Sequence, residues 1–220
     1  MFNNSATTES FRQPQQDRSR ETLTRILDSA TEILEYKNFE ELTIAEVVSK
    51  AETSVGAFYG RFADKDALLH ALDERFLAGF KKRLSERIAS KDWEHGTIAY
   101  VARDAIGFMV EIYGRDHGLL RSLNMKARIH GDDRFKERER RAWDELYPAL
   151  EKVLLVHEHL IRHPHPRRAV LFGFQQMFFA MREFLLWEPL RTGQTCDTGP
   201  LITELTRAYL AYLGIEPADS

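Results

Sequence analysis

The sequence predicts an all-α fold made of a small N-terminal helix-turn-helix domain and a larger C-terminal helical bundle. Beyond residue 17, almost every segment repeats its apolar residues with the spacing of a helix. No segment alternates apolar and polar residues between hairpin turns, and no internal repeat is present. With 220 residues and 43% hydrophobic side chains, the chain is long and apolar enough to bury a core.

The N-terminal 17 residues are rich in Asn, Ser, Thr and Gln, so we expect residues 1–17 to form a disordered arm. They lack the apolar run of a signal peptide, and polar side chains interrupt the most apolar stretch, 169–187. We therefore expect no membrane span. The single cysteine, Cys196, excludes an internal disulfide and favours a reducing cytoplasm.

Three short helices are predicted before residue 64. The first carries its apolar residues from Leu23 to Leu34 and ends near Asn38, because asparagine tolerates the left-handed conformation after a helix. Thr43 and Glu46 have the spacing of a capping box, which starts a second helix running to about Lys50. After a tight turn, residues 53–62 form the third helix, and the pair makes a candidate helix-turn-helix.

Residues 53–62 have the features of a helix that enters a DNA groove. Phe58 and Phe62 share one side, while the opposite side holds Thr53 and the small residues Gly56, Ala57 and Gly60. Small outward residues let the backbone approach the DNA closely. The side chains expected to donate hydrogen bonds to phosphates or base edges are Thr43, Thr53, Ser54, Tyr59, Arg61 and Lys65.

Two observations count against this interpretation. A glycine-rich corner between two core helices would show the same local pattern. Residues 18–65 also carry seven basic and nine acidic side chains, whereas a typical DNA-binding module is basic. The hypothesis therefore requires the basic groups to gather around the third helix and the start of the first helix. We expect few phosphate contacts and weak binding at high salt.

The segment from Arg18 to Ala78 resembles the N-terminal domain of the TetR family of bacterial transcription regulators. The residues that carry the resemblance are Phe39, Thr43, Ile44, Val47, Ser54, Gly56, Phe58, Tyr59, Phe62, Lys65, Asp66 and Leu68. The resemblance implies a homodimeric repressor that a small-molecule effector releases from a palindromic operator. It implies a DNA-binding domain over 18–78 and a ligand-binding and dimerisation domain over 79–220. It also places DNA contacts at Thr43, Ser54, Val55, Gly56, Ala57, Tyr59, Gly60, Arg61 and Lys65.

Three positions depart from the family pattern. Glu52 occupies the turn, where glycine is usual, and Gly60 replaces a frequent aromatic residue or histidine. Val55 replaces a common basic residue, which removes one ionic contact but allows contact with a thymine methyl group. These changes predict an unusual operator sequence.

Helices are predicted in the C-terminal part at 96–113, 118–129, 132–160, 166–188 and 198–213, with Pro148 kinking or splitting the third. The helix over 166–188 is apolar nearly all round, so we expect a second subunit to cover one side of it. The predicted dimer interface contains Phe172, Gly173, Ala180, Trp187, Leu205, Tyr209 and Tyr212. The alternative is that these residues are ordinary core of a monomer.

A ligand pocket is predicted between the helices at 96–113, 132–160 and 166–188. Its candidate lining residues are Phe108, Met109, Ile112, Tyr113, Trp143, Tyr147, Gln175, Phe178 and Phe179. Gln175 favours a pocket because a buried amide needs a hydrogen-bond partner. The alternative is that this stripe of aromatic residues and methionine is core.

Four histidines in one short run, His157, His159, His163 and His165, raise the alternative of a metal-responsive regulator. Prolines interrupt any helix there and no HExxH or CxxC motif accompanies them, so we expect no bound metal. No cofactor is expected either. The chain has no glycine-rich phosphate loop after a strand and no nucleophile elbow, so an enzyme is disfavoured. A purely structural helical adaptor remains a further alternative.

Overall fold

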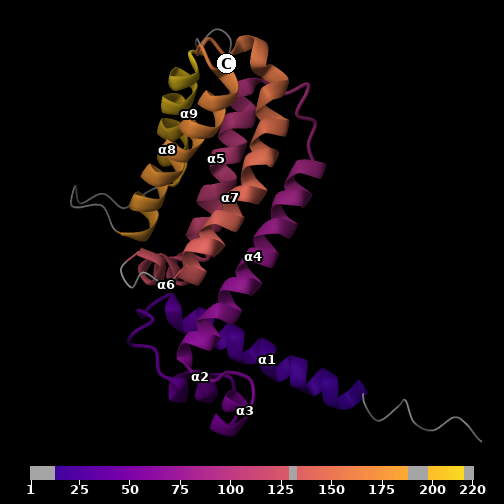
Figure 1. Ribbon diagram of the computed structural model, residues 1–220, viewed down its shortest axis with the longest axis vertical. Coiled ribbons are helices and arrows are strands. Elements are labelled where there is room, and N and C mark those ends of the chain that lie inside the picture. The colour runs from indigo at the N-terminus through magenta and orange to yellow at the C-terminus, as the bar shows by residue number, and fades with distance from the viewer. Residues whose placement is uncertain (1–12, 129–132, 188–197, 216–220) are drawn as a thin grey trace, which may run out of the picture. The chain divides into compact units, whose positions relative to one another are not determined.

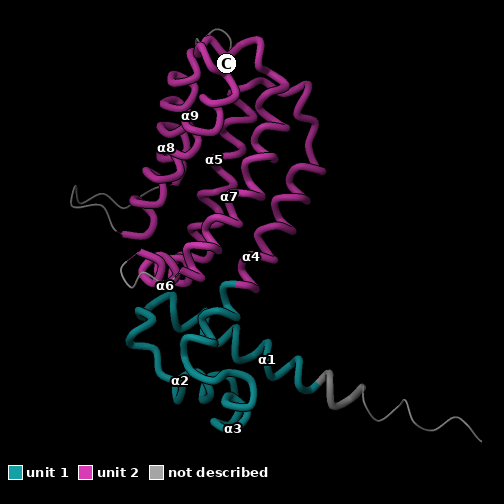
Figure 2. Tube along the Cα trace, viewed as in Figure 1, with its two compact units in different colours: residues 1–73 teal, residues 74–220 magenta. Residues whose placement is uncertain are grey.

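The computed structural model of this chain describes residues 13–128, 133–187 and 198–215. Every regular element in these ranges is a helix, which confirms the predicted all-α fold (Figure 1). The chain divides into two compact units, residues 1–73 and residues 74–220 (Figure 2). The division lies between Asp73 and Glu74, whereas the sequence predicts it after residue 78.

Helix α1 (Gln13–Leu34) begins earlier than the sequence predicted. The expected disordered arm covered residues 1–17, but from Gln13 onward the backbone is already helical. Residues 1–12 lie outside the described residues. Proline at position 14 is compatible with this start, because its missing N–H is not needed in the first turn of a helix.

The N-terminal unit contains α1, α2 (Ile44–Lys50), α3 (Val55–Tyr59) and the first part of α4 (Lys65–Ala89). Helix α2 packs against both α1 and α3. The side chains buried in this unit come from all four helices and from the loop between α1 and α2. They include Ile26, Ile33, Leu34, Leu42, Val47, Phe58, Leu68, Leu69 and Leu72.

Helix α5 (Ile98–Arg115) lies at the centre of the C-terminal unit and packs against α6, α7, α8 and α9 (Figure 1). Thr97 caps its start by accepting a 3.1 Å hydrogen bond from the amide of Tyr100. Apolar side chains surround the helix, which explains its contacts on several sides. The remaining elements are α6 (His117–Arg128), α7 (Asp133–Leu154), the 3₁₀ segment η1 (Leu155–Leu160), α8 (Pro166–Leu186) and α9 (Thr198–Leu213).

Helix α7 runs through Pro148 without a break, so the expected split at this residue is wrong. Pro148 is exposed, and water can bond the carbonyl that a proline leaves without its usual amide partner. The α-helix ends instead at Leu154, where the backbone tightens into η1. His157 has non-helical dihedral angles within that segment. The predicted helix over 132–160 is therefore two elements.

Helices α8 and α9 pack closely through Gly173. A Cβ atom at this position would lie 2.6 Å from Tyr212 and 2.9 Å from Tyr209, so only glycine allows the contact. The hydroxyl of Tyr209 donates a 2.8 Å hydrogen bond to the carbonyl of Val170. Helix α8 is long and apolar enough to cross a membrane, but core helices pass the same test, so this is weak evidence for a membrane span.

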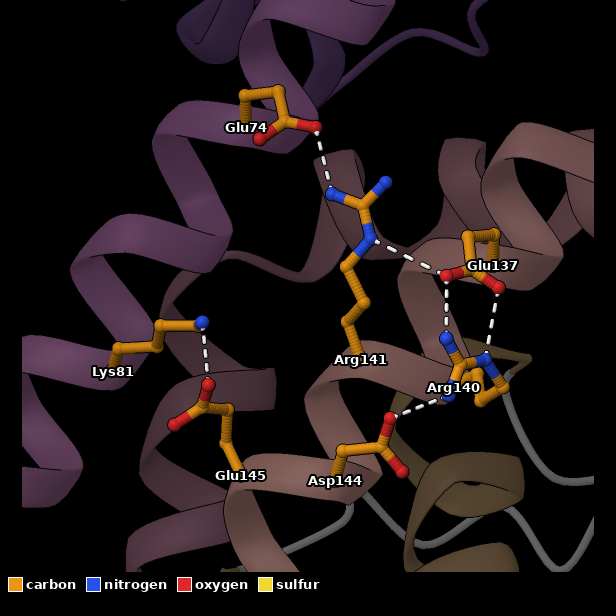
Figure 3. A network of polar contacts seen from close by, with 7 residues as sticks. All are labelled: Glu74, Lys81, Glu137, Arg140, Arg141, Asp144 and Glu145. Carbon is orange, nitrogen blue, oxygen red and sulfur yellow. Dashed lines mark hydrogen bonds and ion pairs between the residues drawn. The ribbon is translucent and has the colours of Figure 1, made fainter.

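Ion pairs connect the C-terminal part of α4 to α7 (Figure 3). Lys81 lies 2.5 Å from Glu145, and Arg141 lies 3.3 Å from Glu74. Arg141 also approaches Glu137, which forms a second pair with Arg140 at 2.6 Å. These groups are substantially exposed, so each pair stabilises the packing only slightly.

Candidate nucleic-acid interface and ligand cavity

Helix α2 begins with the capping box that the sequence predicted. The hydroxyl of Thr43 accepts a 3.2 Å bond from the amide of Glu46, and the carboxylate of Glu46 accepts a 3.0 Å bond from the amide of Thr43. The same hydroxyl donates to that carboxylate at 2.8 Å. Thr43 therefore has a structural role at the helix start, besides the DNA contact that the sequence predicts.

The turn after α2 has the hydrogen bonds of a Schellman motif. The amide of Thr53 donates to the carbonyl of Val48, and the amide of Glu52 donates to the carbonyl of Ser49. Glu52 has a φ of 49°, and it is the single non-glycine residue with positive φ in the described ranges. This explains why glycine suits the position and why glutamate is strained there.

Helix α3 buries its aromatic side and exposes its small side. Phe58 is fully buried and Phe62 is buried beside it, with their ring centroids 5.2 Å apart. Ser54 caps the helix by accepting a 3.1 Å bond from the amide of Ala57. The exposed or half-exposed residues are Thr53, Ser54, Val55, Gly56, Ala57, Tyr59 and Gly60.

Gly56 is the most open position on α3. A Cβ atom placed there would meet nothing closer than the Ser54 hydroxyl oxygen at 3.9 Å. Neither φ nor packing within the chain therefore requires glycine at this residue. A requirement for glycine would have to come from something outside the chain that approaches the backbone closely.

Arg61 is bonded within the chain. Its guanidinium donates to the carbonyl of Ala57 at 2.7 Å and to the hydroxyl of Ser19 at 3.0 Å. These bonds hold the end of α3 against α1. The sequence predicted a side chain that reaches DNA, whereas the structure shows one that also fixes the position of α3.

Lys65 has a different role from the predicted phosphate contact. Its ammonium group donates to the carbonyls of Phe39, Glu40 and Leu42 at 2.9, 3.0 and 3.2 Å. It also lies 4.7 Å from the centre of the Phe39 ring. Because an ammonium has three N–H donors, these bonds use all of them. Lys65 therefore ties α4 to the loop between α1 and α2.

Two further lysines of the N-terminal unit pair with carboxylates. Lys50 lies 2.8 Å from Glu32, and Lys37 pairs with Glu46. The hydrogen bond from Lys37, together with the bonds from Thr43, lowers the pKa of the Glu46 carboxyl to about 2. These pairs neutralise part of the acidic charge counted in the sequence. Arg18, Arg20 and Arg25, on the N-terminal part of α1, are exposed to solvent.

The C-terminal unit contains a narrow, partly enclosed cavity between its helices. Five of the nine predicted residues line it: Met109, Ile112, Tyr113, Trp143 and Phe178. The other four lie elsewhere. Phe108 is buried beside a separate, smaller cavity, Tyr147 and Gln175 border an open groove, and Phe179 is 40% exposed.

Sequence reasoning missed most of the polar residues of this cavity. Asn124, Arg138 and Glu139 line it, and each lies on a helix of mixed composition that gave no signal of a site. Arg182 is not part of the lining but contacts two of these residues. Its side chain is 7% exposed, and its guanidinium donates to Glu139 at 3.3 Å and to Asn124 at 3.4 Å. The interruption of the apolar α8 by Arg182 could have identified it.

The surroundings of this polar group are buried and largely apolar. Burial raises the pKa of the Tyr113 hydroxyl to about 12, and burial lowers the pKa of the Arg182 guanidinium. Both shifts have the same cause, because an apolar environment disfavours the charged form of each group. The rings of Phe178 and Phe179 lie 5.8 and 5.0 Å from the Arg182 guanidinium carbon.

The predicted dimer interface is wrong at three of its residues. Gly173 and Tyr209 are buried in the contact between α8 and α9 of one chain, and Leu205 of α9 is buried as well, so none of the three offers a surface to a second subunit. Ala180 and Tyr212 are half-buried, while Phe172 and Trp187 are exposed. The error arose because α8 and α9 pack on each other, a contact that periodicity along each helix does not show. The exposed aromatic residues of α8 and of the residue that follows it are Phe172, Phe179, Phe184 and Trp187, which we call the aromatic face.

The histidine cluster does not assemble into a metal site. The imidazole of His157 is buried and bonds the carbonyl of Trp93 at 3.1 Å, while the ring of His163 accepts a bond from the amide of His165. In the part of the chain that the structure describes, no three His, Cys, Asp or Glu side chains could together hold a metal ion.

Comparison with known proteins supports the identification of the N-terminal domain. The family model of the bacterial regulatory proteins of the tetR family matches residues 26–72. An uncharacterised HTH-type transcriptional regulator of Bacillus subtilis strain 168, YvdT, is 33% identical over 64 residues. That match covers 29% of this chain and 33% of the relative, so the chain matches about a third of that protein's length.

Solved structures share the fold over nearly the whole chain. A TetR-family transcriptional regulator from Mesorhizobium loti superposes with a TM-score of 0.65 over 90% of this chain and 97% of its own, at 17% identity. The regulator FadR from Bacillus subtilis, solved in complex with stearoyl-CoA, superposes with a TM-score of 0.61 over 86% of this chain and 98% of its own, at 15% identity.

Proposed function

We propose that this chain is a homodimeric repressor released from a palindromic operator by a small-molecule effector. The proposal is supported by residues 26–72, which match the family model of the tetR family of bacterial regulatory proteins. The observation that carries the DNA-binding part is the exposed, small face of α3, centred on Gly56. The cavity in the C-terminal unit supports the effector part, and the aromatic face of α8 supports the dimer.

In this proposal α3 enters the major groove with Gly56 toward the DNA. The absence of a side chain lets the backbone come close to the base edges, and Val55 is placed to contact a thymine methyl group. Ser54 and Tyr59 supply polar contacts at the rim of the helix. Arg61 and Lys65 hold α3 and α4 in position through their bonds within the chain.

The phosphate contacts come mainly from α1. Arg18, Arg20 and Arg25 are exposed near its N-terminal end, whereas Lys37, Lys50 and Lys65 are bonded within the chain. A small number of phosphate contacts predicts a shallow dependence of the binding constant on salt concentration. DNA sequence and shape would then contribute a large share of the specificity.

Dimerisation would bring two copies of α3 to successive turns of the operator, about 34 Å apart. The aromatic face exposes Phe172, Phe179 and Phe184 on α8, and Trp187 directly after the helix. Large apolar patches of this kind mark interaction surfaces. A second copy of the same chain would bury the face symmetrically in an isologous contact.

Effector release follows if the effector binds better to a state in which the α3 helices do not match the operator. The cavity is lined by Phe76 and Phe80, which lie on α4. Because α4 continues into the N-terminal unit, a ligand that shifts these side chains can move the DNA-binding unit. The α4 ion pairs with α7 in Figure 3 would be redistributed in the same movement.

The test is a gel-shift assay with the DNA upstream of the chain's own gene, comparing wild type with Gly56→Ala. Wild type should shift this DNA selectively at low salt. Gly56→Ala should fold at least as well, since alanine favours a helix over glycine by up to about 1 kcal/mol, yet bind the DNA at least about tenfold more weakly.

Gly114→Ala is the matched control. It makes the same change on α5, at an exposed site where a Cβ atom meets nothing within 4 Å. This variant should bind the DNA as wild type does. If the folded dimer shows no sequence-selective shift at low salt, the proposed repressor function is refuted. If both alanine variants bind the DNA equally well, α3 does not dock on DNA with Gly56 toward the groove.

A further inference from the structure

The N-terminal part of α1 buries little of its surface. The side chains of Arg18, Ser19 and Arg20 are exposed, and the first buried side chain among those that the structure describes in this helix is Ile26. Apolar packing therefore contributes little to the orientation of α1 before Ile26. A polar contact in this part of the helix carries correspondingly more weight.

Arg61, which follows α3, makes that contact. Its Nη2 donates to the hydroxyl of Ser19 at 3.0 Å and to the carbonyl of Ser19 at 3.3 Å. Its Nη1 donates to the carbonyl of Ala57 at 2.7 Å, so one guanidinium bridges α1 and α3. Among the described residues, the two bonds to Ser19 are the hydrogen bonds that join residues 18–25 to another element.

Ser19 stands between two exposed arginines. Arg18 and Arg20 are its neighbours in the helix, and at 100° per residue their side chains leave α1 on either side of Ser19. The contact that holds Ser19 beside α3 therefore also sets the directions in which both guanidinium groups leave the helix. Phosphates line both walls of the groove that α3 would enter, and arginine binds phosphate through paired N–H donors.

We propose that Ser19 is a positioning residue for DNA binding, whose contact with Arg61 holds Arg18 and Arg20 where they bind phosphates beside the groove that α3 enters. The inference rests on the proposed function, in which α3 reads the DNA. It assigns Ser19 no contact with DNA. A helix end that is already ordered in the free protein loses less conformational entropy on binding, so the contact raises the affinity.

The experiment measures binding of the full-length protein to labelled DNA by fluorescence anisotropy, between about 50 and 200 mM salt. One duplex is the DNA upstream of the chain's own gene, and the other has the same length and a shuffled sequence. Ser19→Ala should bind both duplexes about fivefold more weakly at the lowest salt concentration. The slope of log K against log salt concentration should become shallower by about one, which is the share of one phosphate contact.

Three proteins serve as controls. Ser19→Ala itself should keep wild-type helicity by circular dichroism, because Ser19 is exposed and alanine is the better helix former. Ser19→Thr keeps a hydroxyl and should restore both the affinity and the slope. Thr22→Ala removes a hydroxyl that bonds the carbonyl of Arg18 within α1 at 2.9 Å, and it should bind DNA as wild type does.

A double-mutant cycle tests whether Ser19 acts through the arginines. Arg18→Gln with Arg20→Gln should weaken binding to both duplexes, because it removes the phosphate contacts themselves. In that background Ser19→Ala should cause no further loss of affinity, since there is nothing left for Ser19 to position.

Wild-type binding by the Ser19→Ala variant would overturn the proposal. An equal loss from Ser19→Ala in the double-glutamine background would overturn it as well, because Ser19 or Arg61 would then contact DNA directly. A loss confined to the upstream DNA would point to the base contacts of α3 instead, since phosphate contacts do not depend on sequence. Each of these results leaves the repressor standing, whereas a wild-type protein that binds neither duplex would refute the proposed function and this inference together.

Discussion

The amide of Thr53 donates a 3.0 Å hydrogen bond to the carbonyl of Val48, and this bond closes the turn between α2 and α3. The closure places Glu52, between them, at a φ of 49°. The left-handed conformation costs a residue with a Cβ atom about 1–2 kcal/mol relative to glycine. The bond that closes the helix-turn-helix therefore requires a backbone conformation at Glu52 that is unfavourable for glutamate.

Glu52→Gly should stabilise the protein. Glycine relieves the left-handed strain but adds entropy to the unfolded chain, so we expect a net gain of about 1 kcal/mol in the free energy of unfolding. In thermal unfolding this corresponds to a rise of about 2–4 °C in Tm for a chain of this size. The control is Glu94→Gly, at an exposed loop position without positive φ, which should be neutral or destabilising. Equal gains from both variants would contradict the strain at Glu52.

Lys65→Met should destabilise the protein. Methionine keeps the apolar stem but removes the three bonds to the carbonyls of Phe39, Glu40 and Leu42. Hydrogen bonds to a charged group stabilise by about 1.5–3 kcal/mol, so we expect the free energy of unfolding in urea to fall by about 2 kcal/mol. Lys82→Met is the control, because Lys82 is exposed and its single ion pair spans 3.9 Å. If the Lys65→Met variant instead keeps wild-type stability but loses DNA binding, Lys65 acts through the phosphate contact that the sequence predicts.

Acid should weaken the N-terminal unit through Glu46. Its folded pKa of about 2 lies below the ordinary glutamate pKa of 4.5, so its contribution to stability is complete above pH 4.5 and is lost as the pH falls toward 2. Glu46→Gln keeps the capping box but removes the charge that pairs with Lys37. The variant should be less stable than wild type at neutral pH, and the difference should disappear near pH 2. Urea unfolding of both proteins across this pH range measures the difference in their free energies of unfolding. A difference that does not change with pH would show that Glu46 does not titrate in this way.

Local structure in the N-terminal unit could be predicted from sequence because its determinants are close along the chain. The capping box joins Thr43 to Glu46, and the buried side of α3 follows from the spacing of Phe58 and Phe62. The roles of Arg61 and Lys65 could not be predicted in this way. Arg61 bonds Ser19, 42 positions away, and Lys65 bonds Phe39, 26 positions away.

The cavity could likewise be predicted only where its residues follow the periodicity of a single helix. Periodicity identified its apolar wall at Met109, Ile112 and Phe178, since each faces inward on its own helix. Its polar residues include Asn124 of α6 and Glu139 of α7, which both bond Arg182 of α8, and these contacts depend on how three helices pack. Part of the predicted dimer interface was misplaced for a related reason, because Gly173 serves the contact between α8 and α9 within one chain.

Placing a charge on the aromatic face of α8 should separate the proposed dimer. Phe172 is 47% exposed and Phe179 is 40% exposed, so replacing them should leave the fold of the C-terminal unit intact. Burying one phenylalanine contributes about 1.5–3 kcal/mol, and a symmetric interface loses it twice. Phe172→Lys with Phe179→Lys should therefore give a monomer by analytical ultracentrifugation at micromolar concentration.

The control for this double variant is Tyr36→Lys, which charges a 67% exposed aromatic residue in the N-terminal unit and should leave the association state unchanged. Circular dichroism should show wild-type helicity for both proteins, because the substituted rings are largely solvent-exposed. The monomer should also lose operator binding, since each operator half-site is then bound independently. A double variant that still sediments as a dimer would place the interface on another surface of the chain.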